Sequence, residues 1–232
     1  MLTEFNDLAA ASTLFVGGHF VLSSAPMRNQ LIAALGRYGF LGLYSLLALA
    51  AFAWMIWSYR LAPYLWVWGS PEWARMIAIA VMPFAAMLVA AGYLTPNPSA
   101  VLGDYVLRRD DPAPGIFKVT RHPVMLGTAL WAAAHLLANG NVAGILLFGS
   151  LLILAVGGIA HIEIKRRASG DPAWQSLTAV TSILPFAAIL SRRTRLNFTS
   201  MDWTRLALGL GLYAALLHLH GWAFGIYLVG KP

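Results

Sequence analysis

The chain contains no cysteine among its 232 residues. Disulfides, thiolate metal ligands, thiolate nucleophiles and iron–sulfur clusters are therefore excluded, and any bound metal must be held by nitrogen or oxygen. Charge is also scarce, because only 11% of the residues are charged and just nine of them are acidic. This scarcity excludes a di-iron site of the kind that needs several inward-facing glutamates.

Apolar residues dominate the composition instead. They make up 59% of the chain, and the mean hydropathy is +0.68. This composition predicts an all-α integral membrane protein. A length of 232 residues suffices for one bundle of membrane helices and is too short for an additional soluble domain, so residues 1–232 are expected to form a single domain. The opening MLTEFNDL is acidic where a secretory signal would be basic, so a retained first span is expected.

Six segments approach the length of about 20 apolar residues that a transmembrane helix needs. They run over residues 6–25, 38–58, 73–94, 122–139, 141–163 and 203–229. The first is the most polar, which indicates a helix surrounded by other helices. The fourth and fifth are joined only by Asn139-Gly140-Asn141, so an antiparallel hairpin is expected. A seventh stretch, 177–190, is too short to span and contains Pro185, which favours an interfacial or re-entrant segment.

The formal net charge of +7 does not indicate a nucleic-acid partner, because the basic residues fall in short loops between apolar segments. The first, third and fifth connections contain most of these residues. With six spans, the positive-inside rule places these three loops in the cytoplasm and both termini on the periplasmic side. The basic residues concerned are Arg28, Arg37, Arg108, Arg109, Lys118, Arg121, Lys165, Arg166, Arg167, Arg192, Arg193 and Arg195.

An Arg-His-Pro triplet precedes the fourth span. Pro123 suits the first turn of a helix, where a missing N–H costs nothing, so the helix is expected to begin there with His122 at its cap. Arg121 and His122 then lie at a positive helix end that favours a phosphate, a carboxylate or a lipid headgroup. The alternative is that Arg121 anchors the span at the membrane interface, and the spacing alone does not separate the two interpretations.

Two histidines lie inside apolar spans. His135 is thirteen residues beyond His122, or about 20 Å along a helix, which places it past the middle of a hydrocarbon layer. His19 lies in GGHFVLS, where Ser23 is one turn away and could hold one ring nitrogen. Such imidazoles could ligate a metal such as haem iron, but the residues alone favour structural histidines bonded to a neighbouring helix. His218 has a depth comparable to that of His135 and is a reserve ligand.

Several segments together resemble the NnrU family of bacterial inner-membrane proteins, which shares its core domain with zeta-carotene isomerase. The matching segments are GGHFVLSS at 17–24, GRYGFLGLYSLLAL at 36–49, LTPNPS at 94–99, GIFKVTRHP at 115–123, WAAAHLLANG at 131–140 and TSILPFAA at 181–188. The resemblance runs nearly end to end and implies a multi-pass protein of the bacterial inner membrane. In the isomerase branch the domain is described as binding haem b through axial histidines, and the matching residues here are His19 and His135.

The resemblance implies a redox-dependent cis–trans isomerase of a lipophilic polyene, or a factor in nitrite and nitric oxide reduction. A non-catalytic assembly or sensing protein is a third class. Arg121 and His122 would then pair with haem propionates or with a substrate anion. The expected partners are the lipid bilayer and a lipophilic small molecule, and a homo-oligomer stays open.

A second family shares the Arg-His-Pro triplet. Membrane methyltransferases of the isoprenylcysteine carboxyl type combine it with a glutamate-rich helix end and a short tyrosine-bearing segment, which together hold S-adenosylmethionine. The segment IEIKRRASGDPAWQSL at 162–177 resembles that arrangement, although the paired glutamates are reduced to Glu163 and Trp174 occupies the tyrosine position. The alternative function is therefore an S-adenosylmethionine-dependent membrane methyltransferase with its pocket beneath the loop from 164 to 202.

Overall fold

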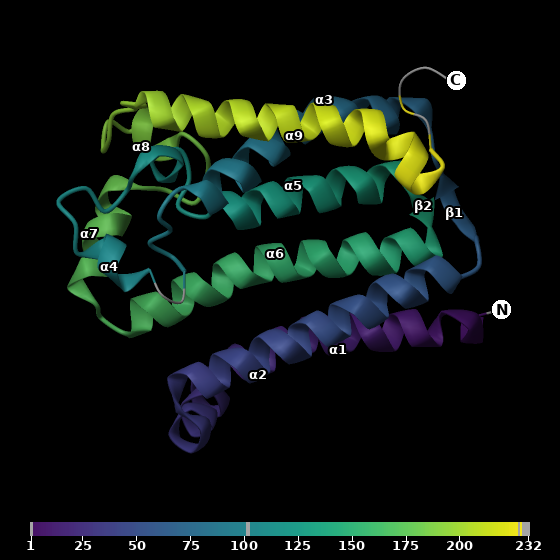
Figure 1. Cartoon of the computed structure of the whole chain (residues 1–232), viewed down its shortest axis with the longest axis horizontal. Helices are drawn as coiled ribbons and strands as arrows, with labels where there is room; N and C mark the ends of the chain where they lie inside the picture. The colour runs from purple at the N-terminus through teal and green to yellow at the C-terminus, as the bar shows by residue number, and fades with distance from the viewer. Residues whose placement is uncertain (1, 101–102, 227, 229–232) are drawn as a thin grey trace. The chain divides into compact units, whose positions relative to one another are not determined.

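The computed structural model describes residues 2–100, 103–226 and 228, and its helices follow one another with short connections (Figure 1). Apart from one short pair of strands, the regular elements of these residues are helical. In chain order they are η1 (Leu2–Phe5), α1 (Asn6–Ser23), α2 (Ala25–Leu61), β1 (Trp66–Gly69), α3 (Glu72–Leu94), α4 (Asp104–Leu107), η2 (Gly115–Lys118), α5 (Pro123–Ala138), β2 (Gly140–Asn141), α6 (Val142–Ala168), α7 (Pro172–Val180), α8 (Ala187–Leu190) and α9 (Ser200–Phe224).

Four of the described helices, α2, α3, α6 and α9, are long and apolar enough to cross a membrane. The chain is therefore an all-α membrane protein, as its composition predicts. The two other predicted spans correspond to α1, which has the length but not the hydropathy, and to α5, which is apolar but has only 16 residues. A total of six spans and the periplasmic placement of the termini stay predictions.

The contacts of the chain divide it into two compact units. The first unit comprises residues 1–78 and 132–161, and the second comprises residues 79–131 and 162–232. Helices α3, α5 and α6 each contribute residues to both units. The expected single domain over residues 1–232 stays a prediction.

In the first unit, α1 lies beside α2 (Figure 1). Ser24 separates the two helices in an extended conformation, and a proline follows in the first turn of α2. The segment 26–37, expected to be a connection, is instead helical and continuous with the predicted span, apart from a kink at Gly36. The physical reason is local, because 27–35 consists mainly of residues with good helix propensity and a glycine at 36 permits the change of direction.

Gly36 has φ 71° and ψ 167°, a backbone conformation that is essentially restricted to glycine. We expect Gly36→Ala to lower the free energy of unfolding by about 1–2 kcal/mol, because the added Cβ disfavours this conformation. Gly42→Ala is the matched control in the same helix, since Gly42 is helical and an added Cβ would meet no atom within 4 Å. Thermal unfolding of the purified protein in mild detergent measures both, and equal midpoints for the two variants would contradict the expectation.

A small two-stranded sheet joins the connection after α2 to the turn between α5 and α6 (Figure 1). β1 pairs with β2 in the antiparallel sense, and the backbone N–H of Val142 donates to the Leu65 carbonyl at 2.9 Å. The Trp68 indole N–H donates to the Leu137 carbonyl at 3.2 Å. The predicted turn at Asn139-Gly140-Asn141 is present, and its glycine is required because an added Cβ would collide with the Trp68 ring. We name this arrangement of β1, β2 and Trp68 the strand clasp.

The second unit contains a closely packed group of membrane helices. A Cβ added at Gly127 of α5 would lie 2.8 Å from the Ala85 carbonyl oxygen of α3, and one added at Gly209 of α9 would lie 2.6 Å from the Met87 Cα. The backbones of α5 and α9 therefore both approach α3 through glycines, as is common where small residues let membrane helices come together. The Tyr213 hydroxyl of α9 also donates to the Ile79 carbonyl at 3.0 Å.

One end of the second unit consists of the connections and short helices α4, η2, α7 and α8. Its buried core includes Leu107, Phe117, Trp174 and Leu177. The predicted interfacial segment 177–190 forms the end of α7, an irregular stretch and α8. This irregular stretch lies against the residues before α5, because the Phe186 N–H donates to the Val119 carbonyl at 2.9 Å.

Candidate functional site

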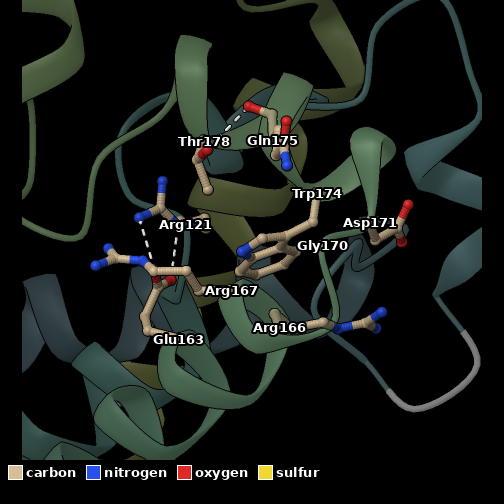
Figure 2. Close-up of a pocket in the computed structure, with 9 residues that line it drawn as sticks. All are labelled: Arg121, Glu163, Arg166, Arg167, Gly170, Asp171, Trp174, Gln175 and Thr178. Carbon is tan, nitrogen blue, oxygen red and sulfur yellow. Dashed lines mark hydrogen bonds and ion pairs between the residues drawn. The ribbon is translucent and has the colours of Figure 1, made fainter.

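Arg121 and Glu163 form a buried ion pair in the second unit (Figure 2). Arg121 Nε donates to Glu163 Oε1 at 2.8 Å, and Arg121 Nη2 donates to Glu163 Oε2 at 3.1 Å. The two side chains are 7% and 9% exposed. Each carboxylate oxygen thus accepts from one guanidinium nitrogen, which is the two-point geometry that makes arginine–carboxylate pairs strong.

Two further residues complete this arrangement. His122 Nε2 lies 2.7 Å from Glu163 Oε1, and the His122 side chain is only 2% exposed. Arg121 Nη1 donates to the Thr181 hydroxyl at 2.9 Å, and this hydroxyl donates to the Leu177 carbonyl at 2.6 Å. We name Arg121, His122, Glu163 and Thr181 the ion-pair cluster.

Three segments far apart in the sequence position the cluster. As predicted, α5 begins at Pro123, so Arg121 and His122 directly precede the helix. Glu163 lies near the carboxyl end of α6. Thr181 follows α7, where the Arg121 N–H donates to the Ser182 carbonyl at 2.8 Å. The beginning of α5, the end of α6 and the segment after α7 are therefore joined at one point.

The structure brings the predicted residues Arg121 and His122 together around an internal carboxylate. The Nε, Nη1 and Nη2 atoms of Arg121 all have protein partners. The role of Arg121 and His122 toward propionates or a substrate anion stays a prediction. Glu163 could be noticed in the sequence as an acidic residue near the end of an otherwise apolar span. Thr181 was part of the matching segment 181–188, but nothing in the sequence indicated it as a partner of Arg121.

A cavity of about 200 Å³ lies next to the ion-pair cluster, between the end of α6 and α7 (Figure 2). Trp174 forms a wall, with the Cζ atoms of Arg121 and Arg166 at 5.9 Å and 5.5 Å from its ring centre. The residues that line the cavity are Arg121, Glu163, Arg166, Arg167, Gly170, Asp171, Trp174, Gln175 and Thr178. Glu163 and Trp174, which the methyltransferase interpretation singled out, thus face one cavity.

His19 lies on α1 in the first unit and is half-buried. Its Nδ1 is 2.6 Å from the Phe15 carbonyl oxygen, and its ring lies 4.6 Å from the Phe15 ring and 5.5 Å from the Tyr44 ring of α2. Because a carbonyl oxygen can only accept, Nδ1 is the nitrogen that bears the hydrogen, and a neutral ring then has its lone pair on Nε2. Ser23, suggested as a partner of His19, has its hydroxyl 3.2 Å from His161 Nε2.

His135 also belongs to the first unit but lies on α5. Its half-buried ring lies 5.2 Å from the Phe148 ring of α6, and its carbonyl accepts from the Asn139 side-chain amide at 2.8 Å. The two proposed axial ligands therefore have different aromatic neighbours. His218, the reserve ligand, is exposed on α9. Over the described ranges, no group of three or more His, Cys, Asp or Glu side chains is arranged to hold a metal ion.

The apolar helices and the buried ion-pair cluster between helix ends define the class as a multi-pass helical membrane protein. Comparison with protein families then identifies the family within this class. The model described as "NnrU protein" matches residues 7–228, so the chain belongs to the NnrU family.

Two curated relatives are plant enzymes named 15-cis-zeta-carotene isomerase, chloroplastic. The protein from Zea mays is 33% identical over 82 residues, which cover 35% of this chain and 22% of the relative. The protein from Arabidopsis thaliana is 30% identical over 129 residues, which cover 49% of this chain and 33% of the relative. The matches thus span between a fifth and a third of these relatives. No solved structure matches the chain.

Proposed function

We propose that this protein is a haem b-dependent isomerase that acts on cis double bonds of a lipophilic polyene within the membrane. The observation that carries the proposal is the hydrogen bond from His19 Nδ1 to the Phe15 carbonyl at 2.6 Å. Metal-ligating histidines commonly donate their other ring N–H to such an acceptor, which fixes the tautomer and the ring orientation. Membership of a family whose domain occurs in two plant isomerases supports the reaction class.

The backbone next to His19 is not blocked by neighbouring atoms. Gly17 and Gly18 precede His19 and are half-buried, yet a Cβ added at either would meet no atom within 4 Å. This part of α1 therefore offers room beside the proposed ligand. Imidazole nitrogen is also the expected donor, because the chain has no thiolate to offer. His19 and His135 are the residues that would hold the iron.

The chain's own residues would orient the ligands and exclude water. The Phe15 carbonyl fixes the His19 ring, and the aromatic rings of Phe15 and Tyr44 cover it on two sides. The Phe148 ring lies 5.2 Å from the His135 ring, in a tilted arrangement. When bound, haem supplies a redox-active iron whose affinity for its axial ligands depends on its oxidation state. The proposal does not require Arg121 or His122.

The setting we propose is the bacterial inner membrane, with the basic loops in the cytoplasm. The last turn of α6 contains Lys165, Arg166 and Arg167, and further arginines follow α4 and α8. Such a bias of basic residues toward short loops is the usual determinant of orientation. A role in nitrite or nitric oxide reduction is the other function that the family resemblance implies, and it would retain the same haem site.

The first test is the absorption spectrum of the purified full-length chain in mild detergent, after haem has been supplied. We expect a haem b spectrum that changes on reduction with dithionite. His19→Ala and His135→Ala should each lose or shift it, because each removes one ligand. His220→Ala on α9 is the control and should leave the spectrum unchanged. A wild type that stays colourless, or two ligand variants with wild-type spectra, would contradict the haem assignment.

The second test is turnover. The reduced protein in liposomes is given 15-cis-zeta-carotene, and the isomers are separated by chromatography. We expect loss of the cis isomer with the wild type and none with His19→Ala. A normal haem spectrum without turnover would instead favour the reductive or the non-catalytic role.

The methyltransferase alternative stays a prediction. Arg121, Glu163 and Trp174 line one cavity, which favours it. The volume of about 200 Å³ counts against it, because pockets for ligands the size of S-adenosylmethionine usually begin near 300 Å³. Binding of S-adenosylmethionine, measured by calorimetry, is the direct test of this alternative.

A further inference from the structure

The cavity between α6 and α7 lies entirely within the second unit and has no part in the proposed isomerase. Three of the residues that line it are arginines and two are carboxylates. Counting formal charges, three positive and two negative groups leave an excess of one positive charge. The way in which these charged groups are paired leaves the excess positive charge available to a ligand.

Both carboxylates already have partners. Glu163 is engaged at both oxygens by Arg121, so this pair presents little net charge to the cavity. Asp171 caps α7, where its Oδ1 accepts from the Ala173 N–H at 3.0 Å. Among the described residues, neither acid forms an ion pair with Arg166 or Arg167.

The two arginines at the end of α6 are less constrained. Arg166 pairs with Asp104 at 3.1 Å, but the Asp104 side chain is 51% exposed, and an ion pair of this kind contributes little and exchanges readily. Arg167 is exposed and has no ion-pair partner within the described part of the chain. In Figure 2 Arg166 extends away from Arg121 on the other side of the Trp174 ring. The cavity is thus lined by a neutralised ion pair, Arg121–Glu163, which we call its floor. It is also lined by two cationic side chains, Arg166 and Arg167.

Its size limits what can bind. The volume of about 200 Å³ lies below the roughly 300 Å³ at which pockets for drug-sized ligands usually begin. This is room for one tetrahedral anion with a few additional atoms. Trp174 is only 2% exposed and is held between two guanidinium groups, so it is a fixed wall.

We propose that this cavity binds a phosphate ester of headgroup size, with Arg166 and Arg167 donating to the phosphate and the Arg121–Glu163 pair forming the floor. Arginine suits this role because its planar guanidinium donates two parallel hydrogen bonds to phosphate oxygens. The phosphate ester can come from a free metabolite or from the headgroup of an anionic phospholipid, and both present the same chemistry.

Glycerol 3-phosphate is the probe for a free metabolite that carries a phosphate ester. It is titrated by calorimetry into the full-length protein in an uncharged detergent. We expect saturable binding that becomes at least tenfold weaker in Arg167→Gln and in Arg166→Gln. Arg195→Gln is the matched control, because Arg195 is an exposed arginine that does not line the cavity. Thermal unfolding of each variant verifies that it is folded.

Nanodiscs test whether the phosphate ester belongs to the headgroup of an anionic phospholipid. The protein is assembled in nanodiscs of phosphatidylcholine with or without phosphatidylglycerol, and bound lipids are counted by native mass spectrometry. Phosphatidylglycerol retained by the wild type and lost in Arg167→Gln supports a lipid headgroup, while binding of glycerol 3-phosphate alone supports a free ester. If neither probe binds, or if Arg167→Gln binds both as the wild type does, the proposal is overturned. The haem spectrum is a separate measurement, so the two proposals can fail independently.

Discussion

Glu163→Gln is expected to lower the free energy of unfolding by about 3–5 kcal/mol, because it leaves the guanidinium of Arg121 buried without a compensating charge. Glu163 also lies 2.7 Å from His122, so a second buried side chain loses the same carboxylate. For a chain of this length the loss corresponds to a decrease of roughly 10 °C in the thermal unfolding midpoint. Circular dichroism of the purified protein in mild detergent measures it.

Two variants separate the buried charge from other effects. Asp104→Asn removes the partner of Arg166 in an ion pair whose acid is half-exposed, and it should cost less than about 1 kcal/mol. The double variant Arg121→Met, Glu163→Leu removes both buried charges and should recover much of the stability lost in Glu163→Gln. If the double variant is as unstable as the single one, shape rather than charge holds this site together.

Gly209→Ala is expected to cost about 2–3 kcal/mol, because the new Cβ would lie 2.6 Å from the Met87 Cα of α3. The atom that it meets belongs to the backbone, so no side-chain rotation can relieve the contact. The adjustment must come from a shift of α9 against α3, which also strains the hydrogen bond from Tyr213 to the Ile79 carbonyl.

Gly211→Ala is the matched control, since Gly211 lies on the same helix and an added Cβ would meet nothing within 4 Å. Alanine is the better helix former, so this variant should be neutral or more stable by up to about 1 kcal/mol. The difference between the two midpoints is the informative quantity. A Gly209→Ala protein that unfolds together with Gly211→Ala would show that close backbone contact does not hold α9 in place.

Features that depend on neighbours in the sequence could be predicted. Pro123 fixed the beginning of α5, and Asn139-Gly140-Asn141 gave the turn before α6, because proline and glycine restrict the backbone locally. The apolar composition gave the membrane class. The helical character of 26–37 was missed because a charged, kinked helix has the same short-range composition as a loop between two spans.

Partners across helices could not be predicted. Ser23 is one turn from His19, yet its hydroxyl lies 3.2 Å from His161, which is 138 residues away. Such a choice depends on the rotation of α1 against α6, and rotation is set by packing that sequence spacing does not specify. For the same reason Arg121 was identified as a basic residue at a helix end, but its pairing with both Glu163 and Thr181 was not.

The strand clasp has a consequence for how the protein is made. It joins Trp66 to Asn141, so about 70 residues of later sequence must leave the ribosome before β1 finds its partner. During that interval the connection after α2 has an unpaired edge, and its exposed tryptophans lack the α5–α6 turn that they later contact. Closure of the clasp therefore has to follow the synthesis of α5, and in a nascent chain that ends before the α5–α6 turn β1 has no strand to pair with.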